Sequence, residues 1–170
     1  WPMGFRVNPR VSPLDPALLA EYRSVPVCHA GDVMGRHTGA RGLRAYHGDL
    51  GLVTCGPAVT VRIRPGDNLM IHLAMMMAEP GDVIVIDGGG DLSTAVIGGL
   101  MRTTALARRL GGFVIDGALR DVAEWAEGGI GAYAAGHVHR GPSKDGPGEV
   151  NVPVACAGMA VRPGDLILGD

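Results

Sequence analysis

The chain has 170 residues, of which 46% are hydrophobic and 19% charged, and its formal net charge is -2. A chain of this length is expected to form a single domain, residues 1–170, and to bury roughly 70% of the surface of its unfolded form. The composition excludes a disordered protein. The charge argues against a nucleic-acid partner, because no basic stripe offers the counterion release on which such binding depends.

The cysteines and the hydropathy exclude further classes. Cys28, Cys55 and Cys156 stand far apart and form no Cys-x-x-Cys pair. We therefore expect neither a disulfide framework nor a structural zinc site, and we predict a reducing, cytoplasmic location. No apolar run reaches the roughly 18 to 20 residues that cross a bilayer, so no membrane partner is expected.

The N-terminal part is predicted to contain one helix, from about Asp15 to Tyr22. Asp15 is suited to the N-cap position and Pro16 to the first helical position. Residues 31–48 show little periodicity and are predicted to be a loop with at most one short helix. Trp1-Pro2 is expected to be a remnant of cloning ahead of the natural start.

The next stretch is rich in β-branched residues. It predicts strands at Leu52–Thr54 and Ala58–Ile63, broken at Gly56-Pro57. The tripeptide Pro-Gly-Asp then occurs three times, and each copy is predicted to form a turn that begins a new element. These elements are a helix at 69–78 and strands at 83–86 and 166–168.

The centre of the chain predicts successive β-α-β units. In order, the expected elements are strand 83–86, a Gly-rich loop 87–93, helix 98–110, strand 113–116, helix 121–127 and strand 132–135. The strands are apolar throughout, which is typical of parallel strands covered on both faces. The long helix is expected to bury the face formed by Leu100, Met101, Thr104, Ala107 and Leu110.

Arg120 and Asp121 directly follow one of these strands, where open α/β sheets place their ligands. Arginine is a permanent cation with five donors, and aspartate is an oxygen ligand for a divalent ion. The pair could therefore serve an anionic, metal-chelating substrate. Alternatively, it is an exposed ion pair, or Asp121 caps the helix ahead of Trp125.

Gly98 and Gly99 begin the long helix at the same crevice. Glycine lets a ligand approach the backbone, so the free amides of Leu100 and Met101 could bind a carboxylate or phosphate with help from the helix dipole. The alternative is that the two glycines only permit close packing of helix and strand.

Other segments give weaker signals. The Gly-rich segment Asp87–Asp91 is similar to nucleotide or S-adenosylmethionine loops but lacks Gly-x-Gly-x-x-Gly. His137 and His139 could share a strand face, without a third zinc ligand at suitable spacing. Residues 139–146 are either a solvated loop or an active-site lid.

Two further segments are considered. Asp67-Asn68 either reaches the crevice or caps a helix. Met75–Met77 is expected to lie in the hydrophobic core.

A resemblance to a known family favours the functional interpretation of these residues. Gly99, twenty intervening residues, Arg120-Asp121, two residues and Glu124 resemble the signature of class II pyruvate aldolases that cleave 4-hydroxy-4-methyl-2-oxoglutarate and 4-carboxy-4-hydroxy-2-oxoadipate. The wider family is known by the regulator of ribonuclease activity A and was formerly labelled demethylmenaquinone methyltransferase. The likeness extends to segments 64–70, 79–82, 116–121, 151–153 and 156–158.

The resemblance implies a three-layer β/β/α swivelling domain that assembles as a trimer or hexamer. It implies that Asp121 holds Mg²⁺ or Mn²⁺, that Arg120 stabilises the pyruvate enolate, and that the amides of Leu100 and Met101 bind the substrate carboxylate. Oxaloacetate decarboxylation is the expected side activity. Gly99 stands where many family members carry an acidic residue.

Relatives in this family continue past the position of Asp170, so a C-terminal tail is expected to be missing from this sequence. Some relatives are non-catalytic proteins that bind a ribonuclease, and this is the competing function that the resemblance implies.

Overall fold

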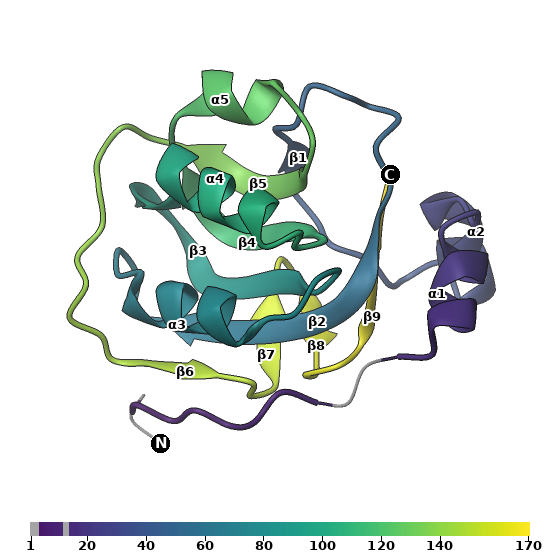
Figure 1. The fold of residues 1–170 in the computed structure, drawn as a ribbon, viewed down its shortest axis with the longest axis horizontal. Coiled ribbons are helices and arrows are strands. Elements are labelled where there is room, and N and C mark those ends of the chain that lie inside the picture. The colour runs from purple at the N-terminus through teal and green to yellow at the C-terminus, as the bar shows by residue number, and fades with distance from the viewer. Residues whose placement is uncertain (1–3, 12–13) are drawn as a thin grey trace.

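The computed structural model describes residues 4–11 and 14–170; the expectation about Trp1-Pro2 lies outside them. Figure 1 shows one large twisted sheet with helices against it. The strands are β1 (Arg44–Ala45), β2 (Thr54–Ile63), β3 (Val83–Ile97), β4 (Gly112–Leu119), β5 (Gly131–His137), β6 (Gly148–Val150), β7 (Val154–Cys156), β8 (Met159–Val161) and β9 (Leu166–Gly169). The helices are α1 (Pro16–Tyr22), α2 (Val27–Val33), α3 (Leu69–Met77), α4 (Gly99–Ala107) and α5 (Val122–Ala126).

The large sheet has the strand order β1-β5-β4-β3-β2-β6, and β9 also pairs with β2. Its centre is parallel, because β2, β3, β4 and β5 are joined through β-α-β connections. The outer pairings of β1, β6 and β9 are antiparallel. The strands β7 and β8 form a separate hairpin.

Two hydrophobic cores show the layers. Alternate strand residues such as Ile84 and Phe113 face the helices and pack with Ile71, Met101 and Trp125. The intervening residues, including Val85 and Val114, face the opposite side and pack against the β7-β8 hairpin. The sheet therefore lies between a helical layer and a small β layer, which confirms the predicted β/β/α architecture.

The predicted N-terminal helix is confirmed as α1, whereas α2, which begins at Val27, was not predicted. The Asp15 carboxylate accepts the N–H of Ala17 at 2.9 Å, and Pro16 occupies the first turn of α1. No described helix is long and apolar enough to span a bilayer.

Two strand predictions were wrong because pairing extends beyond the local signals. β2 runs unbroken through Gly56-Pro57, where it pairs with β9 and Pro57 lies opposite Leu166. The predicted Gly-rich loop 87–93 is instead part of β3, which pairs with β4 through several register shifts. Gly89 and Gly90 have φ of 65° and 71°, so they allow the strand to bulge without ending.

The predicted buried face of the long helix was also partly wrong. Met101 and Leu110 are buried as predicted, whereas Leu100, Thr104 and Ala107 are exposed. The helix α4 buries Arg102 and Ala105 in their place. Arg102 lies in the core layer because its guanidinium donates to the Gly128 carbonyl at 2.8 Å.

The methionine run of α3 was predicted to be core as a whole. Met75 is buried, whereas Met76 is 72% exposed.

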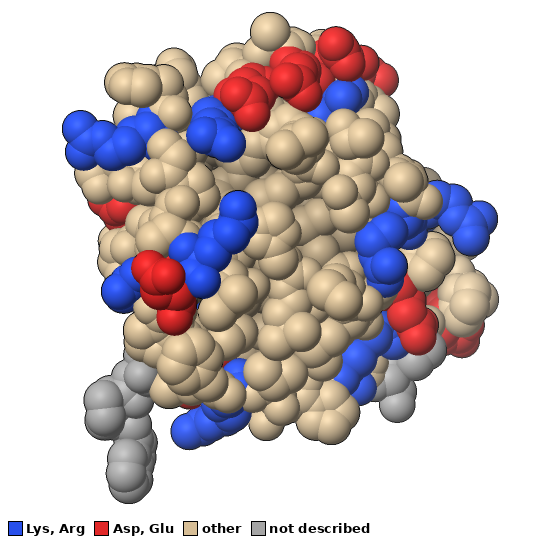
Figure 2. Space-filling view, turned by 60° about the vertical axis from the view of Figure 1, so that its left-hand side comes forward, with Lys and Arg blue, Asp and Glu red and all other residues tan. Residues whose placement is uncertain are grey.

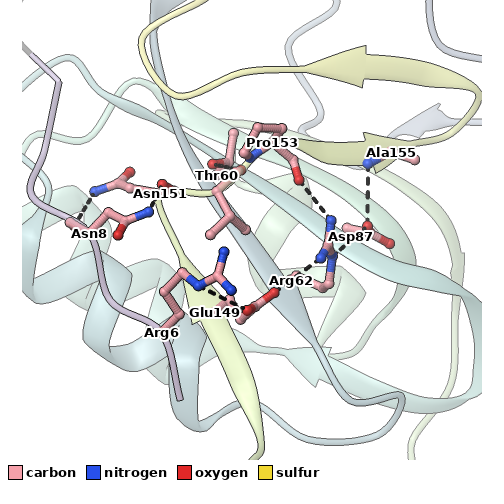
Figure 3. A network of polar contacts seen from close by, with 10 residues as sticks. Arg6, Asn8, Thr60, Arg62, Asp87, Glu149, Asn151, Pro153 and Ala155 are labelled. Atoms are coloured by element: carbon pink, nitrogen blue, oxygen red, sulfur yellow. Dashed lines mark hydrogen bonds and ion pairs between the residues drawn. The ribbon is translucent and has the colours of Figure 1, made fainter. Parts of the chain in front are cut away.

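A polar network joins the layers at the β6 edge (Figure 3). Arg62 on β2 donates to Glu149 on β6 at 3.0 Å and to the Pro153 carbonyl at 2.7 Å. Asn8 and Asn151 exchange side-chain hydrogen bonds with each other's backbone, at 2.9 and 3.1 Å. These contacts attach the N-terminal segment and the β7-β8 layer to the main sheet.

Candidate active site

Two strand ends and a helix start meet at one place. The N–H of Arg120, which follows β4, donates to the carbonyl of Ile97 at the end of β3 at 3.0 Å. Gly98 and Gly99 follow Ile97 and begin α4. The crevice expected from the β-α-β order is therefore present, because parallel neighbours end at the same edge of the sheet.

Asp121 turns its carboxylate toward α4. Its backbone is left-handed, with φ 61° and ψ 46°, a conformation that aspartate tolerates better than most residues. Its Oδ2 atom accepts the N–H of Gly99 at 2.8 Å, and the side chain makes no capping hydrogen bond to α5. Asp121 thus occupies the N-cap position of α5 while its carboxylate serves the start of α4.

Arg120 is held loosely by its neighbour. Its Nε atom lies 3.7 Å from Asp121 Oδ2, and the two side chains are 41% and 40% exposed. A Cβ atom placed on Gly141 would lie 2.8 Å from Arg120 Nη1, so the guanidinium packs against the backbone of the loop after β5. Most of its donors remain available to a ligand.

The two glycines make room for charged side chains. A Cβ on Gly98 would lie 2.6 Å from Asp121 Oδ2 and 3.0 Å from Arg120 Cγ. A Cβ on Gly99 would overlap the carboxylate of Glu124. Glu124 therefore occupies the space in which an acidic side chain at position 99 would begin.

The predicted pair of free amides is only partly present. The Met101 N–H donates to the Gly98 carbonyl at 3.0 Å, and the Gly99 N–H is taken by Asp121. Of the amides in this first turn, that of Leu100 makes no hydrogen bond within the described part of the chain.

A small cavity of about 80 Å³ opens at this point. Gly98, Gly99, Leu100, Met101, Arg120 and Asp121 all line it, so the structure brings every predicted site residue together. Asn68, His72 and Lys144 also line the cavity. Of the two alternatives for Asp67-Asn68, both are present, because Asn68 reaches the crevice while Asp67 Oδ1 accepts the N–H of Leu69 at the start of α3 at 3.0 Å. His72 on α3 was not predicted as a site residue, and Lys144 belongs to the loop 139–146, for which a place at the active site was one of two alternatives.

His72 is expected to be neutral. Burial lowers its pKa, and the positive charge of Lys144 lowers it further. A neutral imidazole can either accept or donate through Nε2, depending on its tautomer.

The donors near Asp121 fit magnesium better than zinc. The described residues contain no group of three or more His, Cys, Asp or Glu side chains placed to hold a metal. His137 instead lies 3.2 Å from the Tyr46 hydroxyl through Nδ1. Mg²⁺ is usually held by one or two carboxylates with waters and substrate as the other ligands, and Asp121 is a half-exposed carboxylate whose Oδ1 forms no hydrogen bond in the described structure.

Sequence comparison places the chain in a family. A family model described as "RraA-like: Aldolase/RraA" matches residues 26–170, so the chain belongs to the RraA-like family. A candidate 4-hydroxy-4-methyl-2-oxoglutarate aldolase from Halalkalibacterium halodurans is 44% identical over 68% of this chain and 55% of its own length. A 4-hydroxy-4-methyl-2-oxoglutarate aldolase from Thermus thermophilus is 36% identical over 61% of this chain and 63% of its own length. The matches thus span between half and two thirds of the length of these relatives.

Solved structures share the fold. The RNA-processing inhibitor RraA from Thermus thermophilus has a TM-score of 0.78 at 29% identity, covering 86% of this chain and 88% of that chain. A structure from Geobacillus kaustophilus, titled S-adenosylmethionine:2-dimethylmenaquinone methyltransferase, has a TM-score of 0.77 at 28% identity, covering 86% and 90%. The fold alone therefore does not select among the activities that these names carry.

Proposed function

We propose that this protein is a divalent-metal-dependent aldolase that cleaves a 4-hydroxy-2-oxo diacid to release pyruvate. The observation that supports this most directly is the joining of Arg120, Asp121 and the start of α4 in one small cavity. The aldolase names of relatives at 36% and 44% identity support the same reaction. The cavity is small, about 80 Å³, which is in keeping with a small acid as the ligand.

Each residue has a separate task in this proposal. The Leu100 N–H, at the positive end of α4, binds the substrate carboxylate next to the 2-oxo group, and the lack of a side chain on Gly98 and Gly99 lets the carboxylate approach the backbone. Arg120 donates to the keto oxygen and stabilises the negative charge that grows there when the carbon-carbon bond breaks. The hydrogen bond from the Gly99 N–H orients the Asp121 carboxylate for binding the metal ion.

Asp121 is the residue that would hold Mg²⁺ or Mn²⁺, and the Glu124 carboxylate lies against Gly99 at the start of α4. Such an ion supplies Lewis acidity, which replaces the Schiff-base lysine of other aldolases. Oxaloacetate decarboxylation is the proposed side activity, because it passes through the same pyruvate enolate.

We also propose a trimer or hexamer in the cytoplasm. Leu100 is 86% exposed and Leu92 49% exposed, and large apolar side chains at such positions favour burial by a second subunit. The three cysteines are free, which suits a reducing compartment.

The competing function is a non-catalytic regulator that binds a ribonuclease. The RNA-processing inhibitor named above shares the fold at 29% identity, which supports this alternative. On the face that carries the loop 139–146, basic and acidic side chains surround an uncharged centre instead of forming a basic stripe (Figure 2). This face therefore offers no obvious surface for direct contact with RNA.

A methyltransferase is the weakest alternative. The segment that suggested a cofactor loop, Asp87–Asp91, lies within β3. The described structure thus has no glycine loop between a strand and a helix at that position.

The deciding experiment is pyruvate release from a panel of 4-hydroxy-2-oxo diacids and oxaloacetate, with and without Mg²⁺. The aldolase proposal predicts release from at least one diacid. An absence of turnover across the panel, together with stable binding to an RNase E-type nuclease in a pull-down, would favour the regulator.

A further inference from the structure

The carbonyl of Arg120 accepts a hydrogen bond from a side chain of the core. Trp125 Nε1 donates to this carbonyl at 3.0 Å, and Trp125 is 0% exposed. Among the described residues, the indole is the one donor that the Arg120 carbonyl has. The bond therefore joins a buried side chain of α5 to the turn that carries Arg120 and Asp121.

The bonded carbonyl belongs to the peptide group between Arg120 and Asp121. Because a peptide group is planar, a donor that holds its oxygen fixes the plane, and with it ψ of Arg120 and φ of Asp121. The preceding peptide group is held as well, since the Arg120 N–H donates to the Ile97 carbonyl at 3.0 Å. The two bonds together set the directions in which both side chains leave the backbone.

The backbone of Asp121 requires such support. Its φ of 61° and ψ of 46° lie in the left-handed region, which residues other than glycine keep only where their surroundings enforce it. The N–H groups of Glu124 and Trp125 donate to the Asp121 carbonyl at 3.0 and 3.3 Å, so the first turn of α5 holds one side of this residue. The indole holds the other side, through the Arg120 carbonyl. The conformation that results directs Asp121 Oδ2 to the Gly99 N–H at 2.8 Å.

The indole is itself fixed by packing. Its ring meets that of Phe113 edge to face, with centroids 5.8 Å apart and an interplanar angle of 84°. Both side chains are 0% exposed and belong to the core between the sheet and the helices. Since such a core is close-packed, the indole N–H is a donor of fixed position.

We propose that Trp125 is a positioning residue for the Arg120-Asp121 pair, because its indole N–H holds the peptide plane that directs the guanidinium and the carboxylate into the site. Trp125 is not among the residues that line the cavity, so it acts through the pair. This role rests on the proposed function where it concerns catalysis, whereas the geometry of the turn does not depend on it. The alternative is that a buried indole N–H only takes the nearest acceptor, in which case the bond stabilises the fold without affecting the site.

The geometric test replaces the indole N–H alone. Benzothienylalanine at position 125 carries sulfur in place of the N–H at nearly the same shape, and tryptophan introduced by the same method is the control. The readout is amide hydrogen exchange at Gly99, which reports the bond to Asp121 Oδ2, relative to exchange at Ile115 in the middle of β4. We expect the ratio of the Gly99 rate to the Ile115 rate to rise about tenfold, since the loss of a buried hydrogen bond loosens the turn locally.

A second protein controls for general loss of stability. Ile84→Val truncates a core residue of β3 away from the turn, so it should lower the melting temperature without raising this ratio. An unchanged ratio in the benzothienylalanine protein, or an equal rise in Ile84→Val, would overturn the positioning role.

The kinetic test separates positioning from stability. At saturating Mn²⁺, the benzothienylalanine protein should lose about tenfold or more in kcat for pyruvate release with little change in KM, because displaced catalytic groups stabilise the transition state less well. Trp125→Phe, which keeps an aromatic core residue but lacks the donor, should show the same loss, and thermal melting verifies that it is folded. A lower melting temperature with an unaltered kcat in both proteins would refute the role.

The two proposals fail in different ways. If the Gly99 ratio rises but wild type releases pyruvate from no substrate, the positioning role stands and the aldolase proposal fails. If wild type releases pyruvate and the ratio does not change, the aldolase proposal stands and Trp125 is only a core residue.

Discussion

Replacing Gly98 by alanine should disable the site while leaving the fold intact. The backbone at Gly98 is extended, with φ -155°, so alanine is tolerated there without strain. The new Cβ would lie 2.6 Å from Asp121 Oδ2, whereas ordinary contacts begin at 3.4 Å. The carboxylate must therefore retreat from Gly99 and weaken a charge-assisted hydrogen bond of 2.8 Å.

The expected magnitude follows from that bond. Hydrogen bonds to charged groups contribute about 1.5–3 kcal/mol, and the 40% exposure of Asp121 favours the lower part of this range. A loss of about 1–2 kcal/mol lowers the Tm of a domain of this size by roughly 2–8 °C. A displacement of about 1 Å at a catalytic group costs on the order of a hundredfold in rate.

The assays are calorimetric melting and Mg²⁺-dependent pyruvate release. Gly117→Ala is the matched control, because its Cβ would meet only Asp91 O at 3.5 Å and Ile115 Cγ2 at 3.7 Å within β4. The control should keep wild-type activity. Full activity in Gly98→Ala, or an equal loss in both variants, would refute the argument that Gly98 exists to admit the Asp121 carboxylate.

Three further predictions concern the rest of the molecule. Burial would raise the pKa of Asp67, but hydrogen bonds from Leu69, Ser143 and the following residues hold it below the usual value. The charged carboxylate should therefore stabilise the fold fully above about pH 4–5, and this stabilisation should be lost as the pH falls through the lower pKa of the folded state. In Asp67→Asn, the free energy of unfolding should depend less on pH below about pH 5. An unchanged pH dependence in that range would contradict this. Ser143→Ala should raise KM more than it lowers kcat in steady-state assays, since it loosens the Lys144 loop; equal changes in both would argue against a binding role. Burial raises the pKa of Cys156 to about 12, so native alkylation at pH 8, read by mass spectrometry, should modify exposed Cys28 and spare Cys156.

Features that depend on neighbouring residues or on the order of the strands could be predicted from the sequence. Arg120 and Asp121 directly follow one parallel strand, and Gly98-Gly99 follow its neighbour, so their meeting required only the strand order. That both faces of the sheet are covered was predictable from its apolar strands, whereas the second β layer was implied by the family resemblance. The N-cap at Asp15 was predictable because it depends on neighbouring residues alone.

Long-range pairing explains what the sequence could not predict. The segment 87–93 has loop-like composition, yet it pairs with β4 and continues as strand. Lys144 reaches the cavity because Ser143 bonds to Asp67, 76 residues away. Asn68 Oδ1 is buried and has no hydrogen-bond partner among the described residues. This could not be predicted from the sequence, because it depends on every residue that surrounds the atom in the fold. Glu124 could be linked to the site by resemblance, but its position over Gly99 is a tertiary contact.

The central claim is that Asp121 holds a divalent ion on which carbon-carbon cleavage depends. The most direct test is the rate of pyruvate release from 4-hydroxy-4-methyl-2-oxoglutarate, titrated with Mn²⁺ after EDTA treatment, in wild type and Asp121→Asn. Asparagine tolerates the left-handed backbone and can still accept the Gly99 N–H, but it lacks the charge. We predict saturable activation in wild type and a loss of at least a hundredfold in the variant. Cleavage that survives EDTA, or equal activity in Asp121→Asn, would contradict the account.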